Sequence, residues 1–327
     1  MAKGKANMKK DEKAAKAEKV KAEKAEKAEK AEKAPMPQID DFKFTGKGSF
    51  KIADCPTSLE IDASEEERYK KKLEKNCKRI AKLQEKLYAE HKEGVIFLLQ
   101  AMDAAGKDST VEHVFKLANP ALMSSYAFKA PSKEELAHDY LWRANMHLPQ
   151  RGSIGIFNRS HYEDVLVVRV NEMWKGYSWP ARCFDMSEKD FFAKRYRQIA
   201  DYERGLYENG YRFVKIFLNV SLDEQKTRFI SRIDEERKNW KFSADDLDNR
   251  PVWDKYMQAF EDSIDATSTS DVPWYVIPAD QKFVARWLVS EALISVLEDI
   301  DPQYPEVSEE DKAEMAECKR KLEAGEV

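Results

Sequence analysis

The sequence has 327 residues, of which 42% are hydrophobic and 35% are charged, and its formal net charge is −4 at pH 7. That length allows one large domain or two small ones, and either would bury a sizeable core. Residues 1–36 hold 12 Lys against seven acidic residues, residues 301–327 hold nine acidic against four basic residues, and these ends cancel. The mild acidity of residues 37–300 therefore argues against broad nucleic-acid binding, which requires a basic face across the folded part.

Cysteine spacing and hydropathy exclude further classes of protein. The four cysteines lie far apart, with no CxxC pair and no Cys/His spacing typical of a zinc site. We interpret them as free thiols in a reducing cytoplasm. No apolar run approaches the ~20 residues that span a bilayer, and the N-terminus lacks the apolar core of a signal peptide. The sequence therefore predicts a soluble cytoplasmic protein without a membrane or nucleic-acid partner.

The first 36 residues form a low-complexity tail. The tripeptide AEK occurs at 17–19 and four times in succession at 22–33, with few large apolar side chains nearby. Such a segment cannot bury a core, and a fraying helix and an unstructured tail both fit its composition. We interpret it as a solvated tail rather than an interaction arm. Residues 301–327 form a second, acidic tail.

Between the tails, residues 37–300 alternate helical and strand patterns and predict a single domain. Ser64-Glu-Glu-Glu67 is a capping box that opens a long amphipathic helix, and VIFLLQ at 95–100 is a continuous apolar run typical of a buried parallel strand. Further strands are predicted at 153–157, 212–220 and 274–278, and further helices after Lys107, from Ser132 to about residue 145, from Ser221, and after the last strand to about Ile300. Strands separated by helices predict an α/β fold, with a mainly parallel sheet that helices flank on both faces.

An insertion separates the third and fourth predicted strands. Residues 228–262 are dense in charged and aromatic residues and show little period-2 alternation, which favours helices over additional strands. We interpret the segment at about 225–265 as a helical lid. It belongs to the same domain, since no linker rich in Gly, Pro or Ser interrupts residues 64–300.

The segment after the first strand is typical of a phosphate-binding loop. It reads AMDAAGKDST from Ala101, with Gly106-Lys107 ahead of a predicted helix. In such a loop, backbone N–H groups surround the phosphates and the lysine reaches the transferred group. Ala101 replaces the usual first glycine and Asp108 the usual Ser or Thr, so a plain turn into a helix is the alternative. The flanking strand and helix favour the phosphate interpretation, with contacts expected from Ala104, Ala105, Gly106, Lys107, Asp108 and Ser109.

Asp103 lies inside this loop. A carboxylate in that position is repelled by phosphate unless it binds a bridging Mg²⁺ or accepts the proton of the nucleophile. Both roles belong to phosphoryl transfer. We therefore expect Asp103 to act in a phosphotransferase site.

Polar residues also follow the second predicted strand, from Asn158 to Asp164. Ligands of open α/β sheets bind beyond the carboxyl ends of the strands. Arg159 offers a planar fork for phosphate oxygens, and Glu163 and Asp164 are candidates for binding metal or orienting the acceptor. We interpret the intervening His161 and Tyr162 as packing residues.

Together these segments resemble the polyphosphate kinase 2 family. The matching stretches include QAMDAAGKDST (100–110), FKAPSKEELAHDYLWR (128–143), IGIFNRSHYEDVLVVRV (154–170), FLNVSLDEQKTRFISRID (217–234), NWKFSADDL (239–247) and PWYVIPAD (273–280). The resemblance implies a P-loop kinase-like fold related to thymidylate kinase. It also implies an activity that moves phosphate between inorganic polyphosphate and nucleotides. The segment FNRSHYEDVLV is similar to the corresponding segment of the class III subgroup, whose members accept AMP as well as ADP.

The resemblance further implies roles for individual residues. It makes Asp103 and Lys107 catalytic and places Arg159 on phosphate. Family members often carry Asp where this chain has Asn158, a poorer metal ligand, so that role passes to Glu163 or Asp164. Because polyphosphate carries about one charge per unit, it needs cations repeated along a groove. The further basic residues expected there are Arg143, Arg228, Arg232, Lys241 and Arg250, although surface ion pairs would equally account for Arg228 and Arg232.

Three functions are consistent with these patterns. The first is a Mg²⁺-dependent (alternatively Mn²⁺-dependent) phosphotransferase between polyphosphate and AMP or ADP, in which Lys107 and Arg159 neutralise the transferred group. Asp103, aided by Glu163 or Asp164, would bind the metal and orient the acceptor. The second is an ATP-dependent nucleoside monophosphate kinase on the same fold, which the irregular loop disfavours. The third is a non-catalytic polyanion-binding protein, which the Asp103/Lys107 pair disfavours. The resemblance implies a homo-oligomer, and the sequence leaves guanine nucleotides open as substrates.

Overall fold

The structure of the protein is a computed structural model that describes residues 35–326. The predicted tail at 1–36 therefore lies almost wholly outside the described residues. The chain divides into two compact units, residues 1–41 and 42–327. In the described part of the first unit, the backbone N–H of Gln38 donates to a carboxylate oxygen of Asp41 at 3.2 Å. The second unit contains the sheet.

Six strands form one sheet in the order β1-β6-β5-β2-β4-β3. They are β1 (Lys43–Phe44), β2 (Gly94–Ala101), β3 (Met123–Ala127), β4 (Ile154–Asn158), β5 (Tyr211–Asn219) and β6 (Trp274–Pro278). All neighbouring strands are parallel except β1 and β6. Every residue of β2 is buried, as expected for a central strand that is covered on both faces. The carboxyl ends of the five parallel strands therefore share one edge of the sheet.

The four strands predicted from apolar runs correspond to β2, β4, β5 and β6, with bounds that differ by at most one residue. The sequence did not predict β1 or β3. β3 occupies one edge of the sheet, and none of its five residues is buried. It lacks the continuous apolar run of a central strand, and its pairing with β4 defines it. β1 has only two residues and pairs with β6.

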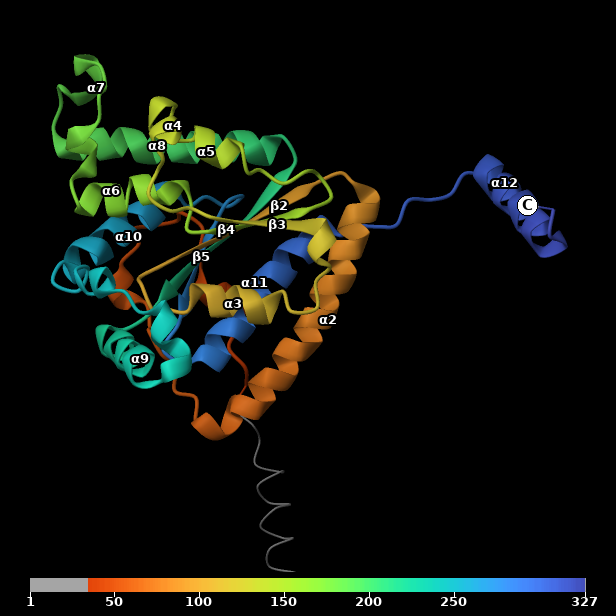
Figure 1. The fold of residues 1–327 in the computed structure, drawn as a ribbon, viewed down its shortest axis with the longest axis horizontal. Coiled ribbons are helices and arrows are strands. Elements are labelled where there is room, and N and C mark those ends of the chain that lie inside the picture. Colours follow the sequence, from red (N-terminus) through yellow and green to blue (C-terminus); the bar gives the residue numbers. More distant parts are fainter. Residues whose placement is uncertain (1–34, 327) are drawn as a thin grey trace, which may run out of the picture. The chain divides into compact units, whose positions relative to one another are not determined.

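Helices cover both faces of the sheet (Figure 1). On one face, α2 (Glu66–Glu90) and α3 (Lys107–Val114) pack with α11 (Lys282–Ile300), and on the other, α10 (Trp253–Thr267) packs against α6 (Val167–Val170) and α8 (Glu188–Glu208). The remaining α-helices are α4 (Lys133–Ala137), α5 (Trp142–Asn145), α7 (Ala181–Phe184), α9 (Leu222–Asp234) and α12 (Glu309–Ala324). Short 3-10 helices are η1 (Ile39–Phe42), η2 (Ile52–Asp54), η3 (Ala63–Glu65), η4 (Pro120–Leu122), η5 (His161–Asp164), η6 (Met173–Gly176), η7 (Glu236–Lys241) and η8 (Ala244–Leu247). The predicted α/β fold class is confirmed, and the insertion at 228–262 is helical, as expected.

The predicted helix starts are partly correct. Ser132 forms the predicted capping box with Glu135, and Ser221 caps α9 by accepting from the N–H of Glu224. The box predicted at Ser64 is wrong, because the side chain that accepts there is Asp62, which caps η3 ahead of α2. An Asp side chain satisfies the free N–H groups of a helix start as well as Ser does.

The helix predicted from Ser132 to about residue 145 is interrupted. It ends at Ala137 and resumes as α5 at Trp142. Between them, the carboxylate of Asp139 accepts from the N–H of Leu141 at 3.0 Å. This local turn competes with the helical hydrogen bonds and accounts for the break.

A fully buried polar network ties the segment after β4 to the sheet. The ammonium group of Lys215 in β5 lies 2.6 Å from a carboxylate oxygen of Glu203 in α8, and neither side chain is more than 1% exposed. The other oxygen of Glu203 accepts from the Tyr162 hydroxyl at 2.9 Å and lies 3.3 Å from Nε2 of His161. Burial acts to raise the pKa of Glu203, but Lys215 and His161 together keep it below its ordinary value.

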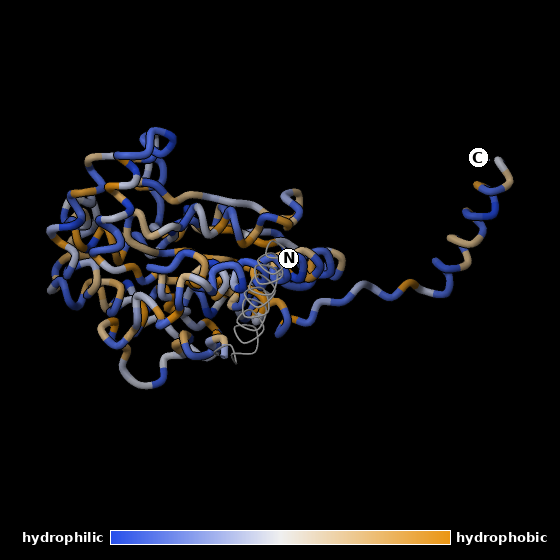
Figure 2. Tube along the Cα trace, turned by 90° about the horizontal axis from the view of Figure 1, so that it is seen from below, coloured by the Kyte–Doolittle hydropathy of each residue, from blue (hydrophilic) through white to orange (hydrophobic). Residues whose placement is uncertain are grey.

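The helices alternate hydrophobic and hydrophilic residues around the sheet, whereas α12 is mainly hydrophilic (Figure 2). Every residue of α12 except Lys321 is exposed. Among the described residues, no helix combines the length and the apolar character needed to cross a membrane.

Replacing Lys215 by methionine should lower the free energy of unfolding by roughly 3–5 kcal/mol, because it leaves the buried Glu203 carboxylate without its ion partner. Urea denaturation at pH 7 measures the change. The matched control is Arg204→Met in α8, the helix that carries Glu203, since Arg204 pairs with Asp201 at the surface and exposed pairs contribute about 0–1 kcal/mol. Equal losses in the two variants would contradict the importance of the buried pair.

Candidate active site

The loop between β2 and α3 has the backbone of a phosphate-binding loop. Ala104 and Gly106 have positive φ angles of 60° and 107°. Glycine adopts this left-handed conformation readily, whereas alanine adopts it only at a cost. Gly106 is also the N-cap of α3, so the unpaired N–H groups of the helix start lie at the end of the loop. The predicted order of strand, loop and helix is therefore confirmed.

The Lys107 side chain folds back over this loop. Its Nζ donates to the carbonyl oxygens of Ala101 and Met102, at 2.8 and 3.1 Å. Burial lowers the pKa of Lys107 and the neighbouring Arg159 lowers it further, although Asp103 partly opposes them. The positive charges of Lys107 and Arg159 therefore repel each other, and an anionic ligand would relieve that repulsion.

Asp103 is held by two donors from distant segments. Its Oδ1 pairs with Nη2 of Arg159 at 2.9 Å, and its Oδ2 accepts from Nδ2 of Asn249 at 2.9 Å. Arg159 directly follows β4 and has a φ of 62°, which is unusual for a residue other than glycine. The Tyr256 hydroxyl donates to Oδ1 of Asn249 at 3.0 Å and so orients that amide. Both oxygens of Asp103 are thus fixed, one of them by the lid.

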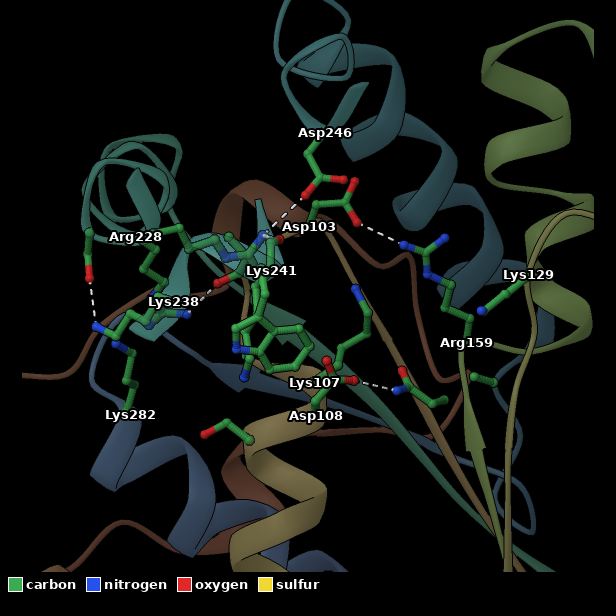
Figure 3. A pocket seen from close by; sticks show the side chains of 18 of the residues that line it. Asp103, Lys107, Asp108, Lys129, Arg159, Arg228, Lys238, Lys241, Asp246 and Lys282 are labelled. Atoms are coloured by element: carbon green, nitrogen blue, oxygen red, sulfur yellow. Dashed lines mark hydrogen bonds and ion pairs between the residues drawn. The ribbon is translucent and has the colours of Figure 1, made fainter. Parts of the chain in front are cut away.

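A cavity of about 640 Å³ opens beside the loop (Figure 3). Nine basic side chains line it: Lys107, Lys129, Arg159, Arg228, Arg232, Lys238, Lys241, Lys282 and Arg286. Only three acidic side chains do so, Asp103, Asp108 and Asp246. In Figure 3, Lys107 lies between Arg159 and Lys129 on one side and Lys238 and Lys282 on the other. This surplus of positive charge favours a polyanionic ligand over a neutral one.

A second, smaller cavity of about 210 Å³ shares Asp103, Arg159 and Asp246 with the first. Glu163 lines it, as does the lid residue Asp245. Burial raises the pKa of Glu163, while Arg159 and Lys107 lower it in part. Asp103 and Glu163 therefore both line this cavity, and their carboxylate oxygens could serve as ligands for a hard cation such as Mg²⁺.

Most of the residues predicted for the site line these cavities. The first cavity receives Asp103, Ala104, Gly106, Lys107, Asp108, Ser109, Arg159, Arg228, Arg232 and Lys241, and the second receives Glu163. Arg232 also pairs with Asp246 at 3.1 Å, which is the surface pairing that the sequence left open for it. Ala105, Arg143, Asp164 and Arg250 line neither cavity.

Two of those exceptions, Arg143 and Asp164, act on each other outside the two cavities. Arg143 is buried, and its Nη2 donates to the carbonyl oxygen of Lys129 at 2.9 Å. Burial raises the pKa of Asp164 to about 7, against the opposing effect of Arg195 and Arg143. The structure therefore separates Asp164 from its neighbour Glu163, which the sequence could not distinguish.

The two irregular positions of the loop region contact each other. Nδ2 of Asn158, at the end of β4, donates to a carboxylate oxygen of Asp108 at 2.6 Å. Asp108 replaces the usual Ser or Thr, and Asn158 replaces the Asp that the family resemblance led us to expect. The carboxylate in this part of the site therefore comes from the start of α3, and the end of β4 contributes an amide.

Several lining residues were missed by sequence reasoning. Lys129, Asp246, Asn249, Lys282 and Arg286 come from three segments that are far apart in the chain. Lys282 and Arg286 lie in the first turns of α11, where their spacing of four residues places them on one face. That spacing was the only signal in the sequence that could have indicated their place in the site. It does not distinguish a binding site, because basic residues at this spacing are common on solvent-exposed helices.

Comparison with known proteins agrees with this geometry. The family profile described as polyphosphate kinase 2 (PPK2) matches residues 63–305. An ADP-polyphosphate phosphotransferase of Rhodopseudomonas palustris is 43% identical over 268 residues, which cover 82% of this chain and 92% of the relative. An AMP/ADP-polyphosphate phosphotransferase of Meiothermus ruber is 45% identical over 229 residues, which cover 70% and 81%.

A solved structure supports the same relationship. The crystal structure of polyphosphate kinase 2 from Arthrobacter aurescens TC1 matches with a TM-score of 0.78 and 35% identity, and the match covers 87% of this chain and 98% of that one. The family profile also spans well over half of the sequence. The chain therefore belongs to the polyphosphate kinase 2 family.

Proposed function

We propose that this protein is a phosphotransferase that moves the terminal phosphate between inorganic polyphosphate and nucleoside mono- or diphosphates. The observation that carries the proposal is the phosphate loop opening into a cavity lined by nine basic side chains. A chain of phosphates needs cations repeated along a groove, because each unit carries about one negative charge. The relatives from R. palustris and M. ruber are named as polyphosphate phosphotransferases, the first for ADP and the second for AMP/ADP, which supports the same activity here.

Catalysis in this proposal depends on positioning and charge neutralisation. Lys107 and Arg159 neutralise the oxygens of the transferred group. Asp103, fixed by Arg159 and Asn249, orients the acceptor. A phosphate oxygen of the nucleotide attacks the terminal phosphorus in line with the bridging oxygen that leaves. One P–O bond forms and one breaks, so the polyphosphate becomes one unit shorter.

We infer that Mg²⁺ takes part, with Asp103 and Glu163 as its protein ligands. Within residues 35–326, no cluster of three or more His, Cys, Asp or Glu side chains is arranged to hold a metal ion. This fits Mg²⁺, which commonly uses one or two carboxylates together with substrate phosphates, and Mn²⁺ is the alternative. When bound, the ion would supply charge neutralisation at the transferred group. Asp164 is less suited, since a pKa of about 7 leaves it partly protonated at neutral pH.

An ATP-dependent nucleoside monophosphate kinase on the same fold is the second candidate. The loop departs from the usual ATP-binding pattern at Ala101 and Asp108, and Asp108 adds a carboxylate to the cavity wall. These departures disfavour the second candidate. The fixed orientation of Asp103 disfavours the third candidate, a non-catalytic polyanion binder. The use of guanine nucleotides, the cytoplasmic location and the self-association inferred from the sequence stay predictions.

The central prediction concerns the donor. Purified protein given AMP or ADP, polyphosphate and Mg²⁺, without ATP, should form ADP or ATP, which chromatography of the nucleotides detects. Turnover of AMP with ATP but not with polyphosphate would favour the second candidate. Polyphosphate binding without turnover from either donor would favour the third.

Replacing Asp103 by asparagine should lower kcat by at least about 10²-fold, because the acceptor loses a fixed charged partner at the reacting group. The melting temperature should stay close to that of the unaltered protein, which thermal denaturation checks. Asp248→Asn is the matched control, since Asp248 is an exposed lid carboxylate that lines neither cavity. A near-normal kcat in Asp103→Asn would remove Asp103 from its assigned role.

The pH dependence of kcat/KM should report Lys107. Its pKa is lowered in the free protein, and phosphate binding requires the protonated form. We therefore expect kcat/KM to fall as the pH rises, at a pH below the ordinary lysine value of about 10.4. In Lys107→Arg the residual activity should lose this alkaline fall, because arginine stays protonated. An unchanged alkaline limb in that variant would assign the titration to another group.

A further inference from the structure

We propose that α9 holds the phosphate loop in its binding shape through Arg228 and Gln225, which bind carbonyl oxygens of the loop. Both would be positioning residues, and Arg228 would not be the phosphate ligand that its place in a basic lid suggests. The loop's role in turnover rests on the proposed function, whereas the contacts of the two side chains stand on the structure alone.

The guanidinium group of Arg228 has no donor left for a ligand. Its Nη1 donates to the carbonyl oxygens of Ala104 and Ala105, at 3.2 and 2.5 Å. Its Nη2 donates to those of Ala279 and Asp280, at 2.6 and 3.1 Å, and its Nε donates to the carboxylate of Glu224 at 2.8 Å. Guanidinium carries five N–H groups, and these five contacts account for all of them. The side chain is only 6% exposed.

Gln225, which also belongs to α9, binds Asp103, the residue before Ala104. Its Nε2 donates to the carbonyl oxygen of Asp103 at 2.9 Å. Nη1 of Arg250 donates to Oε1 of Gln225 at 2.7 Å, which fixes the orientation of the amide. This explains why Arg250, expected on phosphate from the sequence, lines neither cavity.

These contacts decide which way the loop peptides face. Asp103, Ala104 and Ala105 all present their carbonyl oxygens to α9. The C=O and N–H of a trans peptide unit point in opposite directions, so the N–H groups of Ala104 and Gly106 are turned away from α9. Both residues line the large cavity. The N–H of Ala105 instead donates to the carbonyl oxygen of Met102 at 3.3 Å, and Ala105 is absent from the lining.

This loop needs such support more than an ordinary phosphate loop does. Its first glycine is replaced by Ala101, and Ala104 adopts a positive φ that alanine disfavours. A loop that relaxed from this shape would turn carbonyl oxygens toward the phosphates and repel them. Side chains that bind those carbonyls prevent this, and a lysine at position 228 could not bind the two loop carbonyls together with the two that follow β6.

The experiment compares Arg228→Lys and Gln225→Glu with the control Arg237→Lys. Arg237 is an exposed residue of the same lid, pairs with Glu235 and lines neither cavity. In both test variants we expect kcat with polyphosphate to fall by about 10²-fold, as misplacement of about 1 Å would cause. Any rise in the KM for polyphosphate should accompany this fall in kcat, whereas the salt dependence of kcat/KM should stay as in the unaltered protein, since no basic side chain that contacts phosphate is lost. The control should match the unaltered protein throughout.

A second measurement is independent of turnover. Amide hydrogen exchange in the loop, residues 103–107, should quicken by at least about tenfold in Arg228→Lys and Gln225→Glu, without ligand and with the rest of the sheet still protected. Unchanged exchange together with near-normal kcat would overturn the proposal. A raised KM and a weaker salt dependence with kcat retained would also overturn it, by making Arg228 a phosphate ligand. If the unaltered protein does not use polyphosphate, the proposed function fails, and hydrogen exchange still decides the role of α9.

Discussion

The ion pair between Asp103 and Arg159 joins the ends of β2 and β4, and both cavities of the site share it. A loop that receives phosphate must be positive, yet Asp103 brings a negative charge to it. Arg159 resolves this conflict by neutralising the carboxylate while its guanidinium still lines the large cavity. Burial lowers the pKa of Lys107, and the same guanidinium lowers it further. One pair of side chains therefore sets the charge balance of the loop and the direction in which its acidic group faces.

The geometry of that pair depends on residues that no ligand reaches. Two and three residues after Arg159, the side chains of His161 and Tyr162 enter the buried network of Glu203 and Lys215. An unpaired charge in such a place costs several kcal/mol, so the network tolerates little movement of the segment that carries Arg159 and Glu163. The sequence interpretation of His161 and Tyr162 as packing residues agrees with their burial. Here the polar core serves the site by keeping a short 3-10 helix in place.

Sequence reasoning succeeded where a single segment carries the information. Continuous apolar runs marked the central strands, and the positions after β2 and β4 marked Asp103, Lys107 and Arg159, because parallel strands place their carboxyl ends together. It failed where side-chain direction or long-range pairing decides. Glu163 and Asp164 are adjacent in sequence, yet of the two only Glu163 lines either cavity of the site. The edge strand β3, the lid residue Asn249 and the basic residues at the start of α11 acquire their roles only through contacts across the fold.

The lid and the phosphate loop share α9, and this limits how the lid can move. Gln225 and Arg228 bind the loop carbonyls, so the first half of α9 moves only if the loop moves with it. Arg232 lies one turn later and pairs with Asp246 inside the lid, partly exposed to solvent. The part of the lid that these contacts leave unattached to the loop therefore lies between Arg228 and Asn249, and it carries Lys238 and Lys241 to the cavity. The basic groups of the lid and the peptide N–H groups of the loop thus reach the same cavity from separately held segments.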